Sequence, residues 1–121
     1  YKVLVCDDEK DIVSALKIYL MADGYQVFEA YNGREAVDIL KKEDIHLVLM
    51  DIMMPIINGY EATKMIRSLD REDAKTIPII AMTANAFTED RLKAKEAGMD
   101  EHIAKPVDPE LLVKVIYESV D

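Results

Sequence analysis

The 121-residue sequence has no tryptophan, a single cysteine, and only four glycines and four prolines. The lone Cys6 excludes an internal disulfide, and its place inside an apolar run fits a buried thiol in a reducing compartment. No apolar run approaches the roughly 20 residues that cross a bilayer, and no stretch has the pattern of a signal peptide. We therefore expect one compact domain over residues 1–121 that does not insert into a membrane.

Basic residues are scarce. The chain has 15 lysines and arginines against 24 acidic residues, a net charge of −9 and a pI near 4.7. A surface of this sign repels a phosphate backbone, so we expect no direct binding of nucleic acid. The same charge argues against a basic surface that would bind membranes.

The stretch that organises the chain is a run of apolar residues, 47–50, that leads directly into Asp51. A short apolar run of this kind is typical of a strand buried on both faces. Pro55 cannot donate to a sheet, so the strand must end before it. Asp51 then lies at the carboxyl end of a strand, where the sites of open α/β sheets gather. The alternative is that Asp51 simply caps nearby backbone.

Five strand patterns alternate with five helix patterns, which predicts an α/β fold with a parallel sheet and right-handed crossovers. Asn32, Asn58 and Asp108 are predicted helix caps. The helix that follows Thr88 has few apolar residues, chiefly Leu92, and is expected to be the least firmly packed. The predicted strands are 2–6, 25–30, 47–51, 77–82 and 101–104, and the predicted inward residues are Ile12, Leu16, Tyr19, Leu20, Ala36, Val37, Leu40, Ala62, Ile66, Leu69, Leu111, Leu112, Val115 and Ile116.

The distinctive polar residues follow the predicted strands and should meet at one edge of the sheet. They are Asp7, Asp8, Asp51, Thr83 and Lys105. Three neighbouring carboxylates repel one another and need a cation, and oxygen ligands without histidine or cysteine suit Mg²⁺. A metal and a lysine beside a carboxylate form a site for phosphoryl transfer, in which Asp51 attacks phosphorus and becomes an acyl phosphate.

These motifs, in this order, resemble the receiver domain of two-component response regulators over essentially the whole chain. The matching pieces are Asp7-Asp8, Asp51 with Met53-Met54-Pro55 and Gly59, Thr83-Ala84, and Lys105-Pro106. The resemblance implies a doubly wound (βα)5, CheY-like (flavodoxin-like) fold with strand order 2-1-3-4-5. The segment 77–107 looks most like receivers of hybrid histidine kinases, while a stand-alone regulator or a receiver cut from a DNA-binding protein stays open.

The resemblance also implies roles for individual residues. Asp51 would accept a phosphoryl group from a histidine kinase or a histidine phosphotransfer domain. Asp8, Asp51 and the carbonyl of Met53 would ligate Mg²⁺, or Mn²⁺ in its place, with Asp7 acting through water. Lys105 and Thr83 would contact the phosphoryl group, with the backbone N–H groups of Met53 and Ala84.

Further residues are implied around this centre. Met53 and Asn85 would tune the lifetime of the phosphorylated state, because they flank the path of the attacking water. His102 stands where the family often has Tyr or Phe, and we expect it to act with Thr83 as a switch. The Lys105-Pro106 peptide is often cis in this family.

Two other functions compete with a signalling switch. A Mg²⁺-dependent phosphatase or phosphotransferase working through an aspartyl phosphate commonly has a second acid two residues after the nucleophile. Met53 occupies that position here and cannot transfer protons. A degenerate receiver used only for docking would not need the intact set of acids, threonine and lysine. We expect a regulatory domain rather than an enzyme, located in the cytoplasm alone or as a soluble part of a larger membrane-bound kinase, with a possible output domain in the parent chain.

Overall fold

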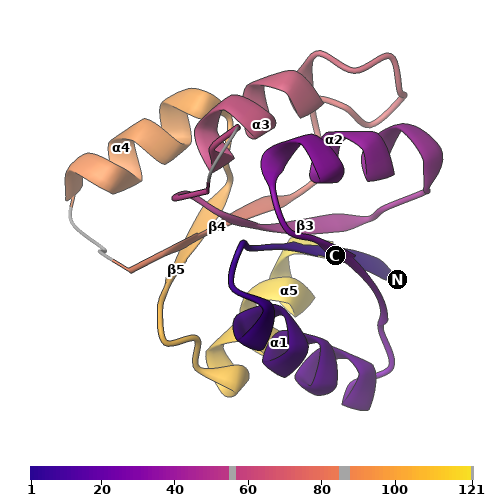
Figure 1. The fold of residues 1–121 in the computed structure, drawn as a ribbon, viewed down its shortest axis with the longest axis vertical. Helices are drawn as coiled ribbons and strands as arrows, with labels where there is room; N and C mark the ends of the chain where they lie inside the picture. Colours follow the sequence, from indigo (N-terminus) through magenta and orange to yellow (C-terminus); the bar gives the residue numbers. More distant parts are fainter. Residues whose placement is uncertain (55–56, 85–87, 121) are drawn as a thin grey trace.

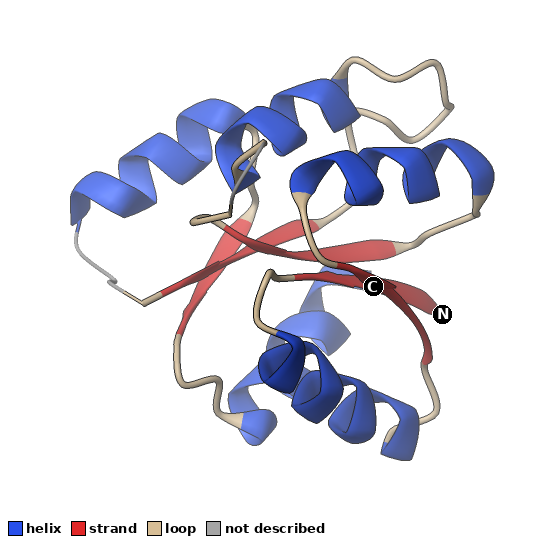
Figure 2. Cartoon of the chain, in the orientation of Figure 1, coloured by secondary structure: helices blue, strands red, loops and turns tan. Residues whose placement is uncertain are grey.

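A five-stranded parallel sheet lies between two layers of helices in the computed structural model (Figures 1 and 2), which describes residues 1–54, 57–84 and 88–120. The strand order is β2-β1-β3-β4-β5, as predicted. In Figure 1, α1 and α5 cover one face of the sheet, and α2, α3 and α4 cover the other. The elements are β1 (Lys2–Cys6), α1 (Lys10–Ala22), β2 (Gln26–Ala30), α2 (Gly33–Lys42), β3 (Leu47–Asp51), α3 (Gly59–Arg67), β4 (Ile79–Thr83), α4 (Thr88–Ala97), β5 (Glu101–Ala104) and α5 (Pro109–Val120).

The core has one half on each face of the sheet. Strands β3 and β4 are buried along their whole length, which explains their continuous apolar sequences. The half under α2, α3 and α4 includes Val37, Leu40, Ile66 and Ala94, whereas the half under α1 and α5 includes Val13, Leu16, Leu20, Leu112 and Ile116.

Side chains at the helix starts fix where α2, α3 and α5 begin. The Asn32 side chain accepts a hydrogen bond from the Glu35 N–H, and Asn58 and Glu61 form a complete capping box. The Asp108 carboxylate accepts from the Glu110 N–H. The predicted caps are thus confirmed. A capping box at α2 would direct the Glu35 carboxylate to the Asn32 N–H, but this carboxylate accepts from the N–H of Tyr31 instead.

Two predicted inward residues are wrong. Tyr19 of α1 is 42% exposed and Leu111 of α5 is 44% exposed. The apolar stripe that each helix buries against the sheet is narrower than the predicted one, so Tyr19 and Leu111 lie outside it. The bounds of two strands also differ from the prediction. β2 begins at Gln26 instead of residue 25, and β4 covers 79–83 instead of 77–82.

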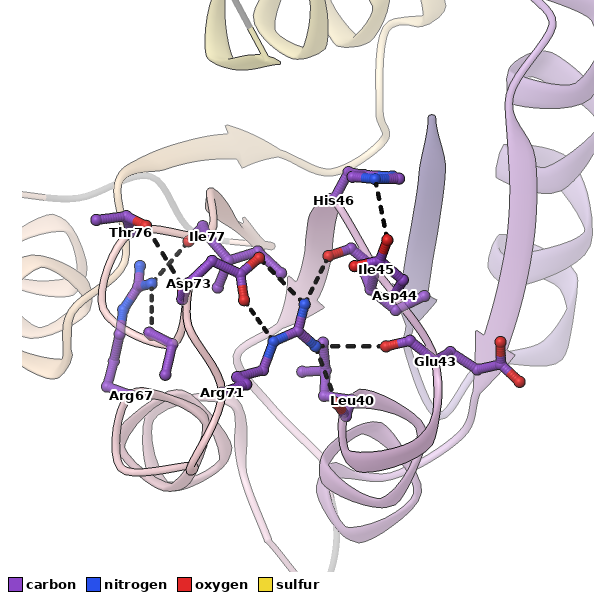
Figure 3. Close-up of polar contacts among 11 residues, drawn as sticks. Leu40, Glu43, Asp44, Ile45, His46, Arg67, Arg71, Asp73, Thr76 and Ile77 are labelled. Carbon is purple, nitrogen blue, oxygen red and sulfur yellow. Dashed lines mark hydrogen bonds and ion pairs between the residues drawn. The ribbon is translucent and has the colours of Figure 1, made fainter.

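Arginine side chains tie together the connections at the amino-end edge of the sheet (Figure 3). The Arg71 guanidinium donates to the carbonyls of Leu40, Glu43 and Ile45 and pairs with Asp73. It therefore holds the segment between α2 and β3 against the segment between α3 and β4.

Within the three described ranges, no helix combines the length and the apolar character needed to cross a membrane.

Candidate phosphorylation and metal site

Asp51 ends β3, and its side chain is almost completely buried at the carboxyl edge of the sheet. The Met53 N–H donates to Asp51 Oδ1 at 3.3 Å. The first residue of α3, Gly59, lies directly against this backbone, because a Cβ at Gly59 would be 2.3 Å from the Asp51 carbonyl oxygen. The sequence indicated a turn or helix start at Gly59 and gave no sign of this contact.

Lys105 joins Asp51 to the end of the neighbouring strand β1. Its ammonium lies 2.6 Å from Asp7 Oδ2 and 3.2 Å from Asp51 Oδ1. Asp7 is fully buried, and its Oδ1 accepts from the N–H of Glu9. Asp7 Oδ2 makes no polar contact in the described residues other than the one to Lys105. One lysine thus lies between two buried carboxylates.

Burial and charge set the protonation of this group. Burial raises the pKa of Asp51 to about 7, and the negative charge of Asp7 adds to this effect, while Lys105 opposes it. The two carboxylates hold the pKa of the Lys105 ammonium above its usual value, although burial alone would lower it. Without another cation, two acids share one positive charge.

The acidic cluster has the donors that a hard divalent cation prefers. One carboxylate oxygen from each of Asp7, Asp8 and Asp51 lies within 4.8 Å of the others. Asp8 is exposed, so the cluster opens to solvent on its side. All three donors are oxygens, and among the described residues Asp7 Oδ2 is a buried oxygen that only Lys105 contacts, so Mg²⁺ fits this set.

Met53, Thr83 and Ala84 follow or end the strands β3 and β4 beside this cluster. Thr83 is buried at the end of β4, and its carbonyl accepts from the Lys105 N–H at 2.8 Å. Ala84 is exposed next to it, and the Met53 side chain is 76% exposed. Asn85 lies outside the described residues. The Lys105–Pro106 peptide is cis, as the resemblance implied.

His102 lies on β5, three residues before Lys105, and its side chain is partly buried. Together with Arg91, Ala94 and Lys95 of α4, it lines a cavity of about 360 Å³ between α4 and β5. Burial, helped by the charge of Arg91, lowers the pKa of His102 below its ordinary value. The imidazole is therefore neutral at physiological pH.

Residues 3–117 match the family described as the response regulator receiver domain. Hybrid signal transduction histidine kinase I of Dictyostelium discoideum is 39% identical over 124 residues, which cover 98% of this chain and 7% of that protein. Probable transcriptional regulator ycf29 of Porphyra purpurea is 36% identical over 120 residues, which cover 99% of this chain and 56% of that protein. The chain thus spans only part of the length of these two relatives.

Solved structures give the same likeness. The chemotaxis protein CheY4 of Vibrio cholerae superposes with a TM-score of 0.92 at 30% identity, covering 98% of this chain and 97% of that one. The receiver domain of sensor histidine kinase PA1611 from Pseudomonas aeruginosa, solved with a magnesium ion in its active-site cleft, has a TM-score of 0.89 at 31% identity. That match covers 98% of this chain and 96% of the other.

Proposed function

Because this chain belongs to the response regulator receiver family, whose members are regulatory domains, we propose that it is a phosphoacceptor switch of a two-component phosphorelay. Asp51 receives the phosphoryl group, and the change at this site alters the surface that partners bind. The whole of residues 1–121 forms this one receiver domain. The observation that carries the assignment is that the Asp51 carboxylate lies within 4.8 Å of carboxylate oxygens of Asp7 and Asp8 and 3.2 Å from the Lys105 ammonium.

Transfer begins with attack of an Asp51 carboxylate oxygen on the phosphorus of a phosphohistidine. The new O–P bond forms as the P–N bond breaks, and the histidine nitrogen keeps the electron pair of that bond. Lys105, now 3.2 Å from Asp51 Oδ1, compensates the charge on the phosphoryl oxygens. The N–H groups of Met53 and Ala84 and the Thr83 hydroxyl supply the remaining donors.

Asp8, Asp51 and the Met53 carbonyl would hold Mg²⁺, with Asp7 acting through water and Mn²⁺ as a substitute. When bound, the cation neutralises charge on the phosphoryl oxygens and on the crowded carboxylates. The likeness to the PA1611 receiver, which was solved with a magnesium ion in its active-site cleft, supports this proposal. The oxygen-only donor set of this chain supports it independently.

The donor of the phosphoryl group is a histidine kinase or a histidine phosphotransfer domain. The receiver belongs to a hybrid kinase, to a regulator with an output domain or to a stand-alone regulator, since the similar proteins include a hybrid kinase, a longer transcriptional regulator and CheY4, a chain of nearly the same length. The net charge of −9 argues that any contact with DNA belongs to another domain. The domain assists only its own phosphorylation and dephosphorylation, since Met53 stands where a phosphatase would need an acid.

Output runs through Thr83 and His102. Thr83 moves toward a phosphoryl oxygen, and His102 turns inward into the space that this movement leaves. The face made by α4, β5 and α5 then changes. Leu92 of α4 is 57% exposed and the helix contacts the core through Ala94 and Ala97, so few apolar contacts oppose such a change.

The test is incubation with acetyl phosphate and Mg²⁺, followed by intact-mass measurement. The wild-type chain should gain one phosphoryl group, and Asp51→Asn should gain none. Asp70→Asn, an exposed acid away from the site, is the control and should behave like the wild type. Equal labelling of Asp51→Asn and wild type would disprove the assignment. Continuous turnover of a small phosphoester would favour the enzyme instead.

A further inference from the structure

An open groove of about 410 Å³ lies between α2 and α3, away from the phosphorylation site. Figure 1 shows these two helices side by side on the same face of the sheet. The groove is lined by Val37, Lys41, Lys64, Met65, Ser68 and Leu69.

The groove has an apolar floor and one exposed apolar wall. Val37 is buried and packs in the core, and Leu69 is partly buried against the same core half. Met65 is 37% exposed, whereas the next residue of α3, Ile66, is fully buried. Methionine is flexible and adapts to different apolar partners. The groove can therefore take up one or two apolar side chains from outside.

The charged residues of the groove are both lysines, on a chain whose net charge is −9. Neither Lys41 nor Lys64 forms an ion pair within the described part of the chain, in contrast to Lys17, which pairs with Glu29 at 2.7 Å. Two nearby acids are engaged elsewhere, because Asp38 pairs with Arg34 and Glu61 closes the capping box of α3. Lys41 also borders a neighbouring hollow lined by the acids Glu43, Asp44, Glu72 and Asp73. Two ammonium groups thus flank the apolar floor without a partner carboxylate.

The groove lies toward the opposite end of the domain from Asp51. Lys41 is in the last turn of α2 and Lys64 is in the last turn of α3. Helices of a parallel α/β fold run back from the carboxyl ends of the strands, so their last turns lie near the amino ends. A protein seated here leaves the entrance to Asp51 open.

We propose that this groove docks an acidic amphipathic helix of a partner protein, which inserts apolar side chains over Val37 and Met65 and places carboxylates against Lys41 and Lys64. The groove lies between helices and offers no strand edge, so the occupant must satisfy its own backbone, as a helix does. A second copy of this chain is disfavoured, because a symmetric contact would bring the lysines of both copies together. At 0.15 M salt, charges beyond about 8 Å are largely screened, so the two lysines that line the groove set the charge next to its apolar floor.

A simpler role for the lysines is to complement the dipoles of α2 and α3, since both lie near a helix C-terminus. Lys42 serves α2 in the same way but does not line the groove. Reversing the charge of Lys42 therefore tests the dipole role, and reversing Lys41 tests docking.

The probe is a synthetic helical peptide of about 18 residues, long enough to hold helix in water, with leucines at i, i+3, i+4 and i+7 flanked by glutamates. Its binding to the ¹⁵N-labelled chain is followed by NMR chemical shifts and by anisotropy. The variant is Lys41→Glu with Lys64→Glu. The matched control is Lys42→Glu with Lys75→Glu, two exposed lysines outside the groove that give the same change in net charge.

Saturable shifts at Val37, Met65 and Leu69 are expected, with affinity at least about tenfold weaker in the groove variant and little changed in the control. A peptide with glutamine in place of glutamate should also bind more weakly. Absence of shifts at millimolar peptide, shifts at another face, or equal weakening by both double variants would overturn the proposal. So would self-association of the wild type, in sedimentation, that the groove variant abolishes.

Discussion

Lys105 places its ammonium 2.6 Å from Oδ2 of Asp7, a carboxyl with no solvent exposure. The same ammonium also serves Asp51 at 3.2 Å. One lysine ammonium thus faces two carboxyl groups, and its single positive charge cannot neutralise both when they are ionised. This imbalance should affect stability, metal binding and phosphorylation.

The first prediction concerns pH. The Asp51 pKa of about 7 in the folded chain exceeds its ordinary value of 3.8, so the folded state retains a proton that the unfolded chain releases. Without Mg²⁺, this group should lower the free energy of unfolding as pH rises from about 4 to about 7, by up to about 4 kcal/mol. Asp51→Asn should remove this loss, as measured by urea unfolding in EDTA.

Glu29 and Asp73, whose pKa values are lowered by hydrogen bonds to Lys17 and Arg71, contribute the opposite slope at more acidic pH. The measure is therefore the difference between variant and wild type at each pH. Asp70→Asn should show no such difference. A parallel pH profile for Asp51→Asn and wild type would contradict the assigned shift.

The second prediction concerns Mg²⁺. A cation among Asp7, Asp8 and Asp51 relieves their repulsion and binds only the folded chain, so millimolar Mg²⁺ should raise the melting temperature by about 2–5 °C. Asp8→Ala should abolish both this rise and phosphorylation. A melting temperature of the wild type that does not respond to Mg²⁺ would disprove a site at these residues.

The third prediction concerns Gly59. Its substitution by alanine puts a methyl group 2.3 Å from the Asp51 carbonyl oxygen, a contact that forces the backbone apart. Gly59→Ala should cost about 1–3 kcal/mol and slow phosphorylation by acetyl phosphate. Gly24→Ala is the control, because its positive φ of 89° is strained for alanine but its Cβ meets nothing within 4 Å. That variant should lose stability and keep its phosphorylation rate.

The fourth prediction concerns the lifetime of the phosphorylated state. The Met53 side chain is exposed at the rim and offers no hydrogen bond to orient an attacking water. Met53→Asn should change the rate of dephosphorylation several-fold, and substitution of Asn85 should also change it. Met21→Asn, at an exposed methionine of α1, should leave the rate unaltered. Unchanged rates for both rim substitutions would show that these residues only fill space.

The fifth prediction concerns His102. Structures with and without beryllofluoride, a phosphoryl analogue, should show two different rotamers of this side chain. His102→Ala should retain phosphorylation of Asp51 but weaken the response of α4 and β5, seen as smaller NMR shift changes on addition of beryllofluoride. If His102 keeps one rotamer while this face still changes, the signal passes through another residue.

The fold was predictable because its signals are local and repeated. Apolar runs that end in Asp7, Asp51 and Thr83 predict buried parallel strands, and parallel strands bring their ends to one edge. This logic alone placed Lys105 near Asp7, residues that are 98 positions apart (105 minus 7) in the chain. Caps at Asn32 and Asn58 were predictable because capping depends on residues within one turn.

Contacts to backbone were not predictable. Arg71 donates to three carbonyls and Arg67 to those of Ala74, Ile77 and Gly98, but carbonyls leave no mark on the sequence. Tyr19 and Leu111 were misplaced because helical spacing alone does not say how wide the buried stripe is. The contact of Gly59 with Asp51 required the path of the whole chain.

Arg67 also determines how α4 is attached to the rest of the domain. Its Nε and Nη2 both donate to the Gly98 carbonyl, just after the end of α4, and Nη2 pairs with Asp100 at 2.9 Å. Among the side chains of α4 from Arg91 onward, the buried ones are the alanines Ala94 and Ala97. The helix is therefore anchored by hydrogen bonds at its C-terminal end, near Gly98. If α4 tilts about this anchored end, its first turn moves farthest.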